Sequence, residues 1–358
     1  MAVTLGSVAT LRAVPTSAPR RIALGALVAA LGTWQFFRWR RAHRPPAEVR
    51  ESRTVELPAN PTGKGIVVAV NPHAGSNDGG TAAVVRTALP EAEVVELDDP
   101  ADLEDVLAAA AGRDDVIAVG AAGGDGTLNR AAAVAHAHRI PLVAIPGGTL
   151  NHFARDLGLQ EEGDALRAVA EGTAVEVDLA RIDGRPFLNT ASFGSYAELV
   201  DAREALEGRL GKWPALAVAA VKVLHHGTPI EVDLDGKTHL LWMVFIGNGR
   251  YQPDGFAPSH RARLDDGQLD LRIIDASHPL SRARLVLGLV TGRLGESPVY
   301  RQWSARTLMI RCEEGPFRLA ADGETFDGGQ EVCVEKVGDR LTVYASAVLA
   351  STESGSSS

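Results

Sequence analysis

A run of apolar residues that ends in a glycine cluster and continues into an alanine-rich segment most constrains the fold of this chain. Residues 116–136 read VIAVGAAGGDGTLNRAAAVAH. The β-branched start predicts a buried strand, and the alanine-rich end has the composition of a helix. A glycine turn between a strand and a helix directs free backbone N–H groups and the positive end of the helix dipole towards an anion. The segment therefore predicts an anion-binding turn that begins at Gly120 and includes Gly123, Gly124 and Gly126.

The glycine turn differs from two familiar phosphate-binding motifs. A Walker A motif needs a lysine after its last glycine, and this chain has no lysine between Lys64 and Lys212. The GxGxxG spacing of dinucleotide-binding turns is also absent. The turn instead contains Asp125, a carboxylate that phosphates repel, so we expect it to hold Mg²⁺ or to orient the loop through hydrogen bonds. A strand-to-helix turn with a capping residue is the alternative that this motif alone leaves open.

Two further apolar runs end in glycine-bearing turns. The run at 66–70 is followed by NPHAGS, and the run at 142–145 is followed by PGGTLN. Strands that alternate with helices at this spacing predict a parallel, doubly wound α/β sheet. Ligands of such sheets bind beyond the carboxyl ends of the strands, so all three turns can contact one nucleotide. The remaining elements expected in this half are a strand at 93–97 and helices at 81–88, 101–111, 152–157 and 164–171.

The second half of the chain changes character and becomes rich in short strands. Many of these strands are joined by Asp-Gly pairs, which are typical of tight hairpin turns. We expect a mainly antiparallel domain, a sandwich or a flattened barrel, with helical segments at 202–225 and 282–294. The strands are expected at 175–182, 186–193, 230–234, 240–246, 269–274, 307–312, 317–320 and 331–337.

Residues 22–37 carry no charge and lie between Arg20-Arg21 and an arginine cluster that begins at Arg38. A helix that spans a bilayer needs about 20 apolar residues, so this segment is short, although flanking arginines and tryptophans extend its reach. We expect a membrane anchor that spans the bilayer or lies in its interface. A cleaved signal peptide and a soluble packing helix are the alternatives. The larger basic cluster follows the segment, which places the main body at the cytoplasmic face.

Composition excludes one class of partner and favours one redox compartment. A formal net charge of −9 argues against a nucleic-acid-binding protein, whose surface would be basic. The chain of 358 residues is long enough for two domains with their own cores. Its two cysteines, Cys312 and Cys333, have no metal-ligand spacing. We expect reduced thiols there, with a disulfide as the alternative.

Five motifs, in order between residues 65 and 345, resemble those of the diacylglycerol kinase catalytic family. That family includes soluble bacterial diacylglycerol kinases, related bacterial lipid kinases and sphingosine kinases. The number and order of the motifs make the resemblance specific. The motifs are Asn71-Pro72 with Gly75, Gly123-Gly124-Asp125-Gly126-Thr127, Pro146-Gly147-Gly148-Thr149-Leu150-Asn151, Asp265-Asp266-Gly267 and Asp322-Gly323-Glu324.

The resemblance implies the domain organisation. A doubly wound α/β nucleotide-binding domain, similar to phosphofructokinase and NAD kinase, is expected at residues 65–172. A mainly antiparallel β-sandwich domain for the lipid substrate is expected at 173–340. Residues 1–64 then comprise a tail, the anchor and a linker, residues 341–350 form an element that returns to the first domain, and residues 351–358 are a disordered tail.

The resemblance also implies roles for individual residues. Asp322 would be the general base that takes the proton from the lipid hydroxyl, and Glu324 would support the base or the metal. Without the family match, an Asp-Gly pair such as Asp322-Gly323 is more often an ordinary hairpin turn. The residues implied to contact ATP are Asn71, Gly123, Gly124, Asp125, Gly126, Thr127, Gly148, Thr149 and Asn151.

Two further positions follow from the resemblance. The segment 263–268 matches a structural Mg²⁺ loop of the bacterial members, in which Asp266 would give its carboxylate and Arg263 and Gln268 their backbone carbonyls. A solvated turn is the alternative for that loop. The chain departs from the family at His152, where many members carry an aspartate after the GGT turn.

We therefore predict a lipid kinase that uses ATP and Mg²⁺ and phosphorylates the hydroxyl of a membrane lipid, first of all diacylglycerol, to give phosphatidic acid. A sphingoid base, monoacylglycerol or phosphatidylglycerol are the alternative acceptors. A NAD kinase-like enzyme and an inactive lipid- or nucleotide-binding module are the alternative functions, the latter because of His152. The expected partners are the lipid substrate and the membrane surface, with no nucleic acid; a homodimer is left open.

Overall fold

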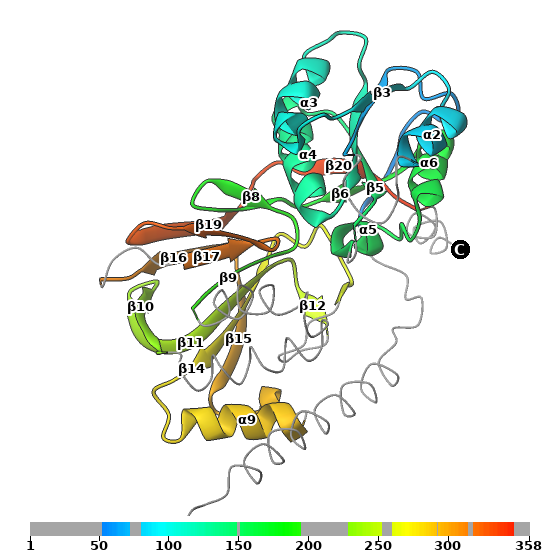
Figure 1. Cartoon of the computed structure of the whole chain (residues 1–358). Helices are drawn as coiled ribbons and strands as arrows, with labels where there is room; N and C mark the ends of the chain where they lie inside the picture. Colours follow the sequence, from blue (N-terminus) through cyan, green and yellow to red (C-terminus); the bar gives the residue numbers. More distant parts are fainter. Residues whose placement is uncertain are drawn as a thin grey trace, which may run out of the picture.

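The computed structural model describes residues 52–71, 80–148, 151–194, 228–252, 260–291, 293–313 and 318–346. These residues form two domains that lie one above the other in Figure 1. The expected anchor at 22–37, the helical segment at 202–225, the tail at 351–358 and Thr149 lie outside the described residues. Among the helices that are described, none is long and apolar enough to cross a membrane.

The first domain is built on a seven-stranded sheet in which five neighbouring strands run parallel. A sixth strand pairs antiparallel with the last strand of the chain, and the first strand closes that edge. In spatial order the strands are β1 (Thr54–Glu56), β6 (Thr173–Val177), β20 (Leu341–Tyr344), β5 (Leu142–Pro146), β4 (Ala118–Gly123), β2 (Ile66–Val70) and β3 (Glu93–Glu96).

Helices cover both faces of this sheet, with α3 and α4 on one side and α2 and α6 on the other (Figure 1). The central strands β2, β4 and β5 are buried along their whole length. A sheet buried on both faces confirms the predicted doubly wound α/β fold. The helices are α2 (Gly80–Ala88), α3 (Leu103–Ala111) after a 3₁₀ turn at Pro100–Asp102, α4 (Asp125–His138), α5 (His152–Asp156) and α6 (Glu162–Glu171).

The central strand differs from its prediction at both ends. It begins at Ala118, and Ile117, whose β-branched side chain favoured a strand, is 51% exposed. Gly120, expected to open the turn, is a strand residue between β2 and β5. A Cβ there would lie 2.9 Å from the Cβ of Val143, so the close approach of β5 requires glycine. The turn itself is short, and helix α4 begins at Asp125.

The second domain is a curved sheet of eleven strands, every pair of which is antiparallel. This confirms the predicted β-rich half. Its strands are β7 (Ala180–Ile182), β8 (Arg185–Phe187), β9 (Thr190–Gly194), β10 (Ile230–Leu234), β11 (Lys237–Asn248), β14 (Leu269–Asp275), β15 (Tyr300–Ala305), β16 (Thr307–Arg311), β17 (Arg318–Ala321), β18 (Glu324–Asp327) and β19 (Glu331–Lys336), with a separate pair β12 (Tyr251–Gln252) and β13 (His260–Arg261).

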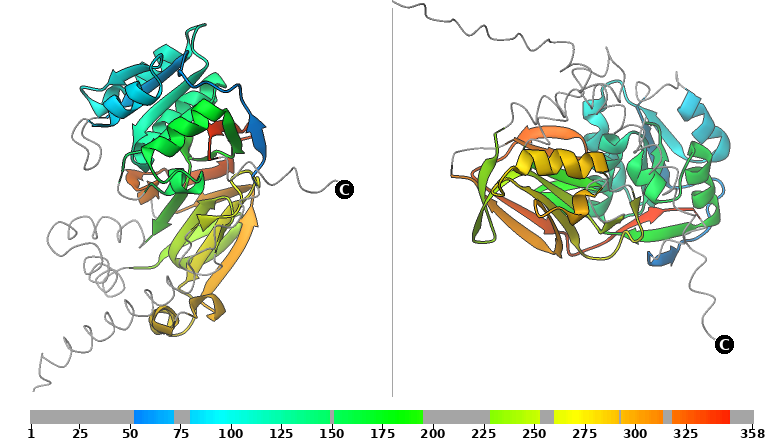
Figure 2. Two further views of the ribbon diagram at one scale, coloured as in Figure 1. Left: turned by 90° about the vertical axis from the view of Figure 1, so that its right-hand side faces the viewer. Right: turned by 90° about the horizontal axis from the view of Figure 1, so that it is seen from below.

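The chain crosses between the two sheets twice. The strand expected over 175–182 is in fact two strands: β6 stays in the first sheet and β7 enters the second. We expected the second domain to begin at residue 173, whereas β6 pairs with β20 and β1 within the first sheet. After β19 the chain returns, and β20 lies between β5 and β6. Figure 2 shows this red strand inside the first domain, among the green and cyan elements.

Each domain has its own apolar core, and α9 (Ser281–Thr291) covers a third, smaller cluster at the far end of the second domain (Figure 1). Trp242, Leu285 and Val299 are buried in that cluster. Cys312 and Cys333 are free thiols, as predicted. Leu188 and Leu264 of the second domain are buried in the core of the first, so the contact between the domains is partly apolar.

Substitution of Gly172 tests whether the close contact between the end of α6 and Leu57 constrains the first domain. It ends α6 with φ 77°, and its carbonyl accepts a hydrogen bond of 2.8 Å from the N–H of Leu57. A Cβ there would lie 2.1 Å from the Leu57 carbonyl oxygen. We expect Gly172→Ala to lower the free energy of unfolding by about 3 kcal/mol, because backbone must move as well as adopt a strained conformation.

Gly184 is the matched control, because it has φ 77° as well but nothing within 4 Å of its missing Cβ. Gly184→Ala should cost only about 1 kcal/mol, the strain of the left-handed conformation. Denaturant unfolding of both variants measures the difference. Equal losses would show that the contact with Leu57 does not constrain the fold.

Candidate functional site

The glycine turns after β4 and β5 touch each other through their backbones. The N–H of Gly147 donates to the carbonyl of Gly123 at 2.9 Å. A Cβ on Gly148 would lie 2.6 Å from the Cα of Gly124, so the turn after β5 has no room for a side chain at that contact. Asn71 follows β2, the next strand of the sheet, and lies at the same edge. The carboxyl ends of three adjacent strands thus bring the turns after β4 and β5 and Asn71, the first residue of the turn after β2, to one edge of the sheet.

Asp125 is the first residue of α4, and its carboxylate orients the neighbouring turn. It accepts hydrogen bonds from the N–H of His152 at 3.1 Å and of Phe153 at 3.0 Å. Of its two predicted roles, the structure shows the orientation of the loop. The contact with His152 uses only the backbone N–H, and the His152 residue is exposed. The tie between the GGT turn and Asp125 therefore does not need an aspartate at residue 152.

The Asn151 side chain forms hydrogen bonds within its own turn. Its side chain accepts from the N–H of Gly148 and donates to the Gly148 carbonyl, each at 2.8 Å. With φ 49°, it is also one of the few non-glycine residues in the left-handed region. The Asn151 amide keeps a second N–H and a second oxygen lone pair beyond these two bonds, so its predicted contact with a nucleotide stays a prediction. Its observed role is to fix the backbone of the glycine turn.

The two domains meet where Gly126 faces Glu324. A Cβ on Gly126 would lie 3.1 Å from Oε1 of Glu324, so the carboxylate of the second domain reaches the first turn of α4. Thr127, one residue further, packs its side chain over Gly123, where a Cβ would lie 2.7 Å from Oγ1. The GGDGT segment and the DGE segment are therefore neighbours in space, although about half of the chain separates them.

Asp322 lies in the turn of the β17–β18 hairpin, with φ 48°. Its carboxylate does not point to solvent but accepts hydrogen bonds from three consecutive backbone N–H groups. Oδ2 accepts from Leu188 at 2.7 Å, and Oδ1 accepts from Asn189 and Thr190 at 2.9 Å each. A hairpin aspartate needs no such partners. Their presence distinguishes Asp322 from an ordinary turn residue.

Burial raises the pKa of Asp322 to about 6, although the three N–H groups favour the ionised form and act in the opposite direction. The negative charge of Asp125 adds to the increase. A carboxyl group with this pKa is largely ionised at pH 7 and still basic enough to accept a proton. These are the properties of a general base that works near neutral pH.

Sequence reasoning missed the residues that join these carboxylates. Asn189 donates from Nδ2 to Oδ1 of Asp125 at 3.3 Å. Arg261, which is completely buried, donates from Nη2 to Oδ1 of Asn189 at 3.1 Å and from Nε to Asp156 at 2.8 Å. No local pattern marks these positions, because an arginine between a histidine and an alanine in a two-residue strand has the composition of a surface segment.

The predicted metal loop is tightly bonded to its surroundings. Oδ1 of Asp266 accepts from the N–H of Gln268 at 2.9 Å, and Oδ2 accepts from the N–H of Arg250 at 2.8 Å. The Gln268 carbonyl accepts from the N–H of Gly249 at 2.9 Å. A Cβ on Gly249 would lie 3.5 Å from the Arg263 carbonyl oxygen and 3.6 Å from Oδ1 of Asp266. Two of the three predicted oxygens therefore face one space beside Gly249.

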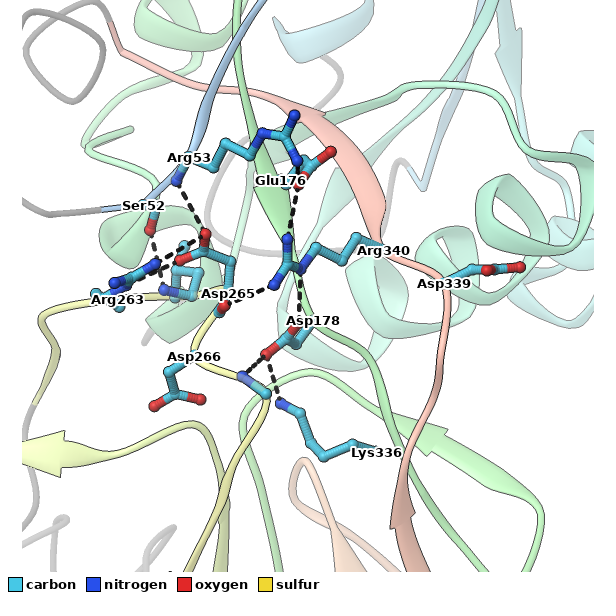
Figure 3. Close-up of polar contacts among 12 residues, drawn as sticks. Ser52, Arg53, Glu176, Asp178, Arg263, Asp265, Asp266, Lys336, Asp339 and Arg340 are labelled. Atoms are coloured by element: carbon cyan, nitrogen blue, oxygen red, sulfur yellow. Dashed lines mark hydrogen bonds and ion pairs between the residues drawn. The ribbon is translucent and has the colours of Figure 1, made fainter. Parts of the chain in front are cut away.

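The neighbouring charges join this loop to both segments that cross between the domains (Figure 3). Asp178, on the first crossing segment, accepts from the N–H of Gly267 at 2.6 Å and pairs with Lys336 at 3.1 Å. Arg340, on the returning segment, donates to Asp178 at 3.3 Å and to the Asp265 carbonyl at 3.1 Å. Asp266 lies on the side away from these contacts. Within the described residues no three His, Cys, Asp or Glu side chains cluster as a metal site.

A cavity of about 820 Å³ lies at the same junction. It is lined by both crossing segments, including Asp178, Lys336 and Arg340, and by the end of α4 at His136. None of the residues predicted to bind a nucleotide lines it. This cavity is therefore distinct from the place where the glycine turns meet Asp322.

Comparison with known proteins agrees with both halves of the chain. Residues 65–182 match the diacylglycerol kinase catalytic domain, and residues 192–345 match the YegS C-terminal NAD kinase beta sandwich-like domain. The chain is 37% identical to a protein of Xanthomonas oryzae named "Probable lipid kinase YegS-like", over 59% of this chain and 73% of the relative. It is 31% identical to a diacylglycerol kinase of Staphylococcus carnosus, over 58% of this chain and 70% of the relative.

A solved structure shows the same fold. The crystal structure of a diacylglycerol kinase from Bacillus anthracis superposes with a TM-score of 0.58 at 20% sequence identity. The superposition covers 80% of this chain and 98% of that one. At this identity the likeness concerns the fold alone, and it extends over both domains.

The close contact between the glycine turns predicts that one added methyl group strongly weakens nucleotide binding. We expect Gly148→Ala to separate the turns and to weaken binding of a non-hydrolysable ATP analogue about 10-fold or more, since a displacement of about 1 Å is enough for large losses. Isothermal titration calorimetry measures the affinity. Gly163→Ala, in α6 with nothing within 4 Å of its missing Cβ, is the control and should bind as the native chain does. Equal affinities of all three proteins would exclude this edge of the sheet as the nucleotide site.

Proposed function

The chain belongs to the diacylglycerol kinase family of lipid kinases, and from this premise we propose that it transfers the γ-phosphate of ATP to the hydroxyl group of diacylglycerol, giving phosphatidic acid. The observation that carries the proposal is the juxtaposition of two carboxylates from different domains. Asp125 comes from the glycine turn of the first domain and Asp322 from a hairpin of the second, and Asn189 contacts both. Phosphoryl transfer requires a nucleotide and an acceptor to be held against each other in this way.

Asp322 is the proposed general base. Its ionised carboxylate accepts the proton of the lipid hydroxyl as that oxygen bonds to the γ-phosphorus. The bond from the γ-phosphorus to the bridging oxygen breaks, and ADP leaves with the electron pair. Glu324, beside Gly126, is proposed to support the base at the phosphate end of the site. The half-buried position and the raised pKa of Asp322 suit this role, because a carboxyl group with a higher pKa is a stronger base.

The glycine turns are proposed to hold the triphosphate. Backbone N–H groups of Gly123, Gly124, Gly126, Thr127 and Gly148 and the start of α4 replace the lysine of a Walker motif. Asn71 and Thr149 complete the proposed nucleotide contacts, and Asn151 acts indirectly by fixing its turn.

Mg²⁺ would neutralise phosphate charge when bound with ATP. A second, structural Mg²⁺ fits the loop in part, because the Arg263 carbonyl and the Asp266 carboxylate face one space. The Gln268 carbonyl would have to share its bond with Gly249. We therefore propose the loop at 263–268 as a structural cation site that also involves the domain junction, and not as the catalytic one.

The proposal also covers the identity of the acceptor lipid and the location of the enzyme. Relatives named YegS-like lipid kinases favour other lipids as the next candidates, among them a sphingoid base, monoacylglycerol or phosphatidylglycerol. We further propose that the apolar segment at 22–37 holds the enzyme at the cytoplasmic face of the membrane. An inactive module is disfavoured, because His152 supplies its backbone N–H to Asp125 as any residue would. A NAD kinase-like activity is tested by adding NAD to the acceptors.

Asp322→Asn is the variant that tests the function. With labelled ATP, Mg²⁺ and mixed micelles of each candidate lipid, we expect the native chain to label diacylglycerol and the variant to lose at least about 100-fold in kcat, the range of a lost general base. Asp183→Asn is the matched control, because Asp183 also begins an Asp-Gly hairpin turn, with φ 50°, between β7 and β8. It should stay within about threefold of native activity, as surface changes usually do. Absence of label in every acceptor would contradict the proposed function.

The pH dependence of the reaction follows from the pKa of Asp322. Below about pH 6 the carboxyl group is mostly protonated and cannot accept the hydroxyl proton. The rate should therefore fall roughly 10-fold for each pH unit below the pKa and level off above about pH 7. Measuring kcat from pH 5 to 8, with ATP and lipid saturating, locates this limb. A rate that stays constant down to pH 5 would mean that Asp322 is not the base.

A further inference from the structure

We propose that Asn189 is a positioning residue that locks the Asp125 carboxylate of the first domain and the Asp322 carboxylate of the second into one fixed arrangement. The inference rests on the proposed function, since it assigns these two carboxylates to the phosphate end and the base end of the reaction. It adds a residue that touches neither ATP nor lipid but sets the distance between the groups that do.

Asn189 lies between β8 and β9 and is 5% exposed. Its backbone N–H donates to Oδ1 of Asp322 at 2.9 Å, and its side-chain Nδ2 donates to Oδ1 of Asp125 at 3.3 Å. Its carbonyl accepts from the N–H of Asn248 at 2.9 Å. One short turn thus contacts the carboxylate at the start of α4 and the carboxylate of the β17–β18 hairpin.

The orientation of the Asn189 amide is fixed by chemistry. Nη2 of Arg261 lies 3.1 Å from Oδ1 of Asn189, and a guanidinium group can only donate. The amide oxygen must therefore face Arg261, and the amide nitrogen must face Asp125. Arg261 cannot turn away, because its other nitrogens donate to Asp156 at 2.8 Å and to the Leu188 carbonyl at 2.6 Å.

An amide is the side chain that this position needs. It accepts from a cation on one side and donates to a carboxylate on the other. An alanine would leave a buried donor of Arg261 and an acceptor of Asp125 without their partner, which is costly inside a protein. An aspartate of the same shape would accept from Arg261 but would oppose Asp125 with a second negative charge.

The consequence for catalysis concerns alignment. Asp125 moves with the first domain and Asp322 with the second, and the Asn189 turn joins them directly. A misplacement of about 1 Å between reacting groups costs about 100-fold in rate. We expect Asn189→Ala to lower kcat by about 10- to 100-fold and to leave the KM for ATP within about threefold.

Asn189→Asp separates positioning from packing, because the introduced carboxyl group can mimic the amide only when it is protonated. In that form its hydroxyl donates to Asp125 and its carbonyl accepts from Arg261. On ionisation it repels Asp125. We expect the kcat of this variant to rise with pH as in the native chain and then to fall again on the alkaline side, where the native rate stays level. A profile that matches the native one in both shape and height would overturn the proposal, since an isosteric residue would then suffice.

Asn129→Ala is the matched control. Asn129 also joins the domains through an amide hydrogen bond, from Nδ2 to the Pro186 carbonyl at 2.9 Å. This bond reaches neither carboxylate. Its pH profile should keep the native shape, and its kcat should fall less than that of Asn189→Ala. An equal loss in both variants would show that general loosening of the domain junction explains the effect.

Hydrogen exchange tests the same inference without any catalysis. In Asn189→Ala, exchange should rise at the amides of 188–190, which bind Asp322, and also at those of His152 and Phe153, which bind Asp125. A rise confined to 188–190 would overturn the proposal. If the native chain labels no lipid, the proposed function fails, whereas this measurement still decides whether Asn189 couples the two domains.

Discussion

The buried guanidinium of Arg261 is the interaction on which the site depends. It is completely enclosed, yet it donates to Asp156, to the carbonyls of Leu188 and Asn248 and to the Asn189 amide. A cation buried in this way is tolerated only when its hydrogen bonds are satisfied, so the groups around it have little freedom. Their fixed positions hold the 188–190 turn, whose N–H groups in turn hold Asp322. The position of the Asp322 carboxylate thus depends on one buried charge in the second domain.

The domain junction repeats this pattern close by, because Asn248 accepts from Arg261 and donates to the Asp178 carbonyl, each at 2.8 Å. Asp178 is buried and pairs with Lys336 and Arg340, while it accepts the N–H of Gly267 from the proposed cation loop (Figure 3). Both segments that cross between the sheets therefore meet at one carboxylate, that of Asp178. These polar contacts join the domains together with Leu188 and Leu264, which the second domain buries in the core of the first. A kinase that must bring a nucleotide and a lipid together can use such a junction to keep the two halves in register.

Close backbone contacts explain why the glycine motifs were informative and where they misled. Glycine at residue 148 is required because the neighbouring turn leaves no room for a Cβ, and the sequence pattern identified that turn correctly. Glycine is required at residue 120 for the same reason, but this residue lies inside a strand, where β5 approaches closely. A sequence shows that a Cβ is absent but not which neighbour excludes it. The prediction of a single strand at 175–182 was wrong for a similar reason. Its two halves pair with different sheets, and the partner of a strand cannot be read from the local sequence.

The family, the two-domain architecture and the turns after β4 and β5 that meet at one edge of the first sheet could all be predicted from the sequence. These features depend on local patterns: apolar runs, glycines and their order along the chain. The fold was needed to show that Asp125 orients a loop, that Asn151 hydrogen-bonds to its own turn, and that Asn189 and Arg261 join the carboxylates. Such roles depend on which donors and acceptors meet after folding. A residue type fixes what a side chain can donate or accept, whereas its partner is set by contacts between segments far apart in the chain.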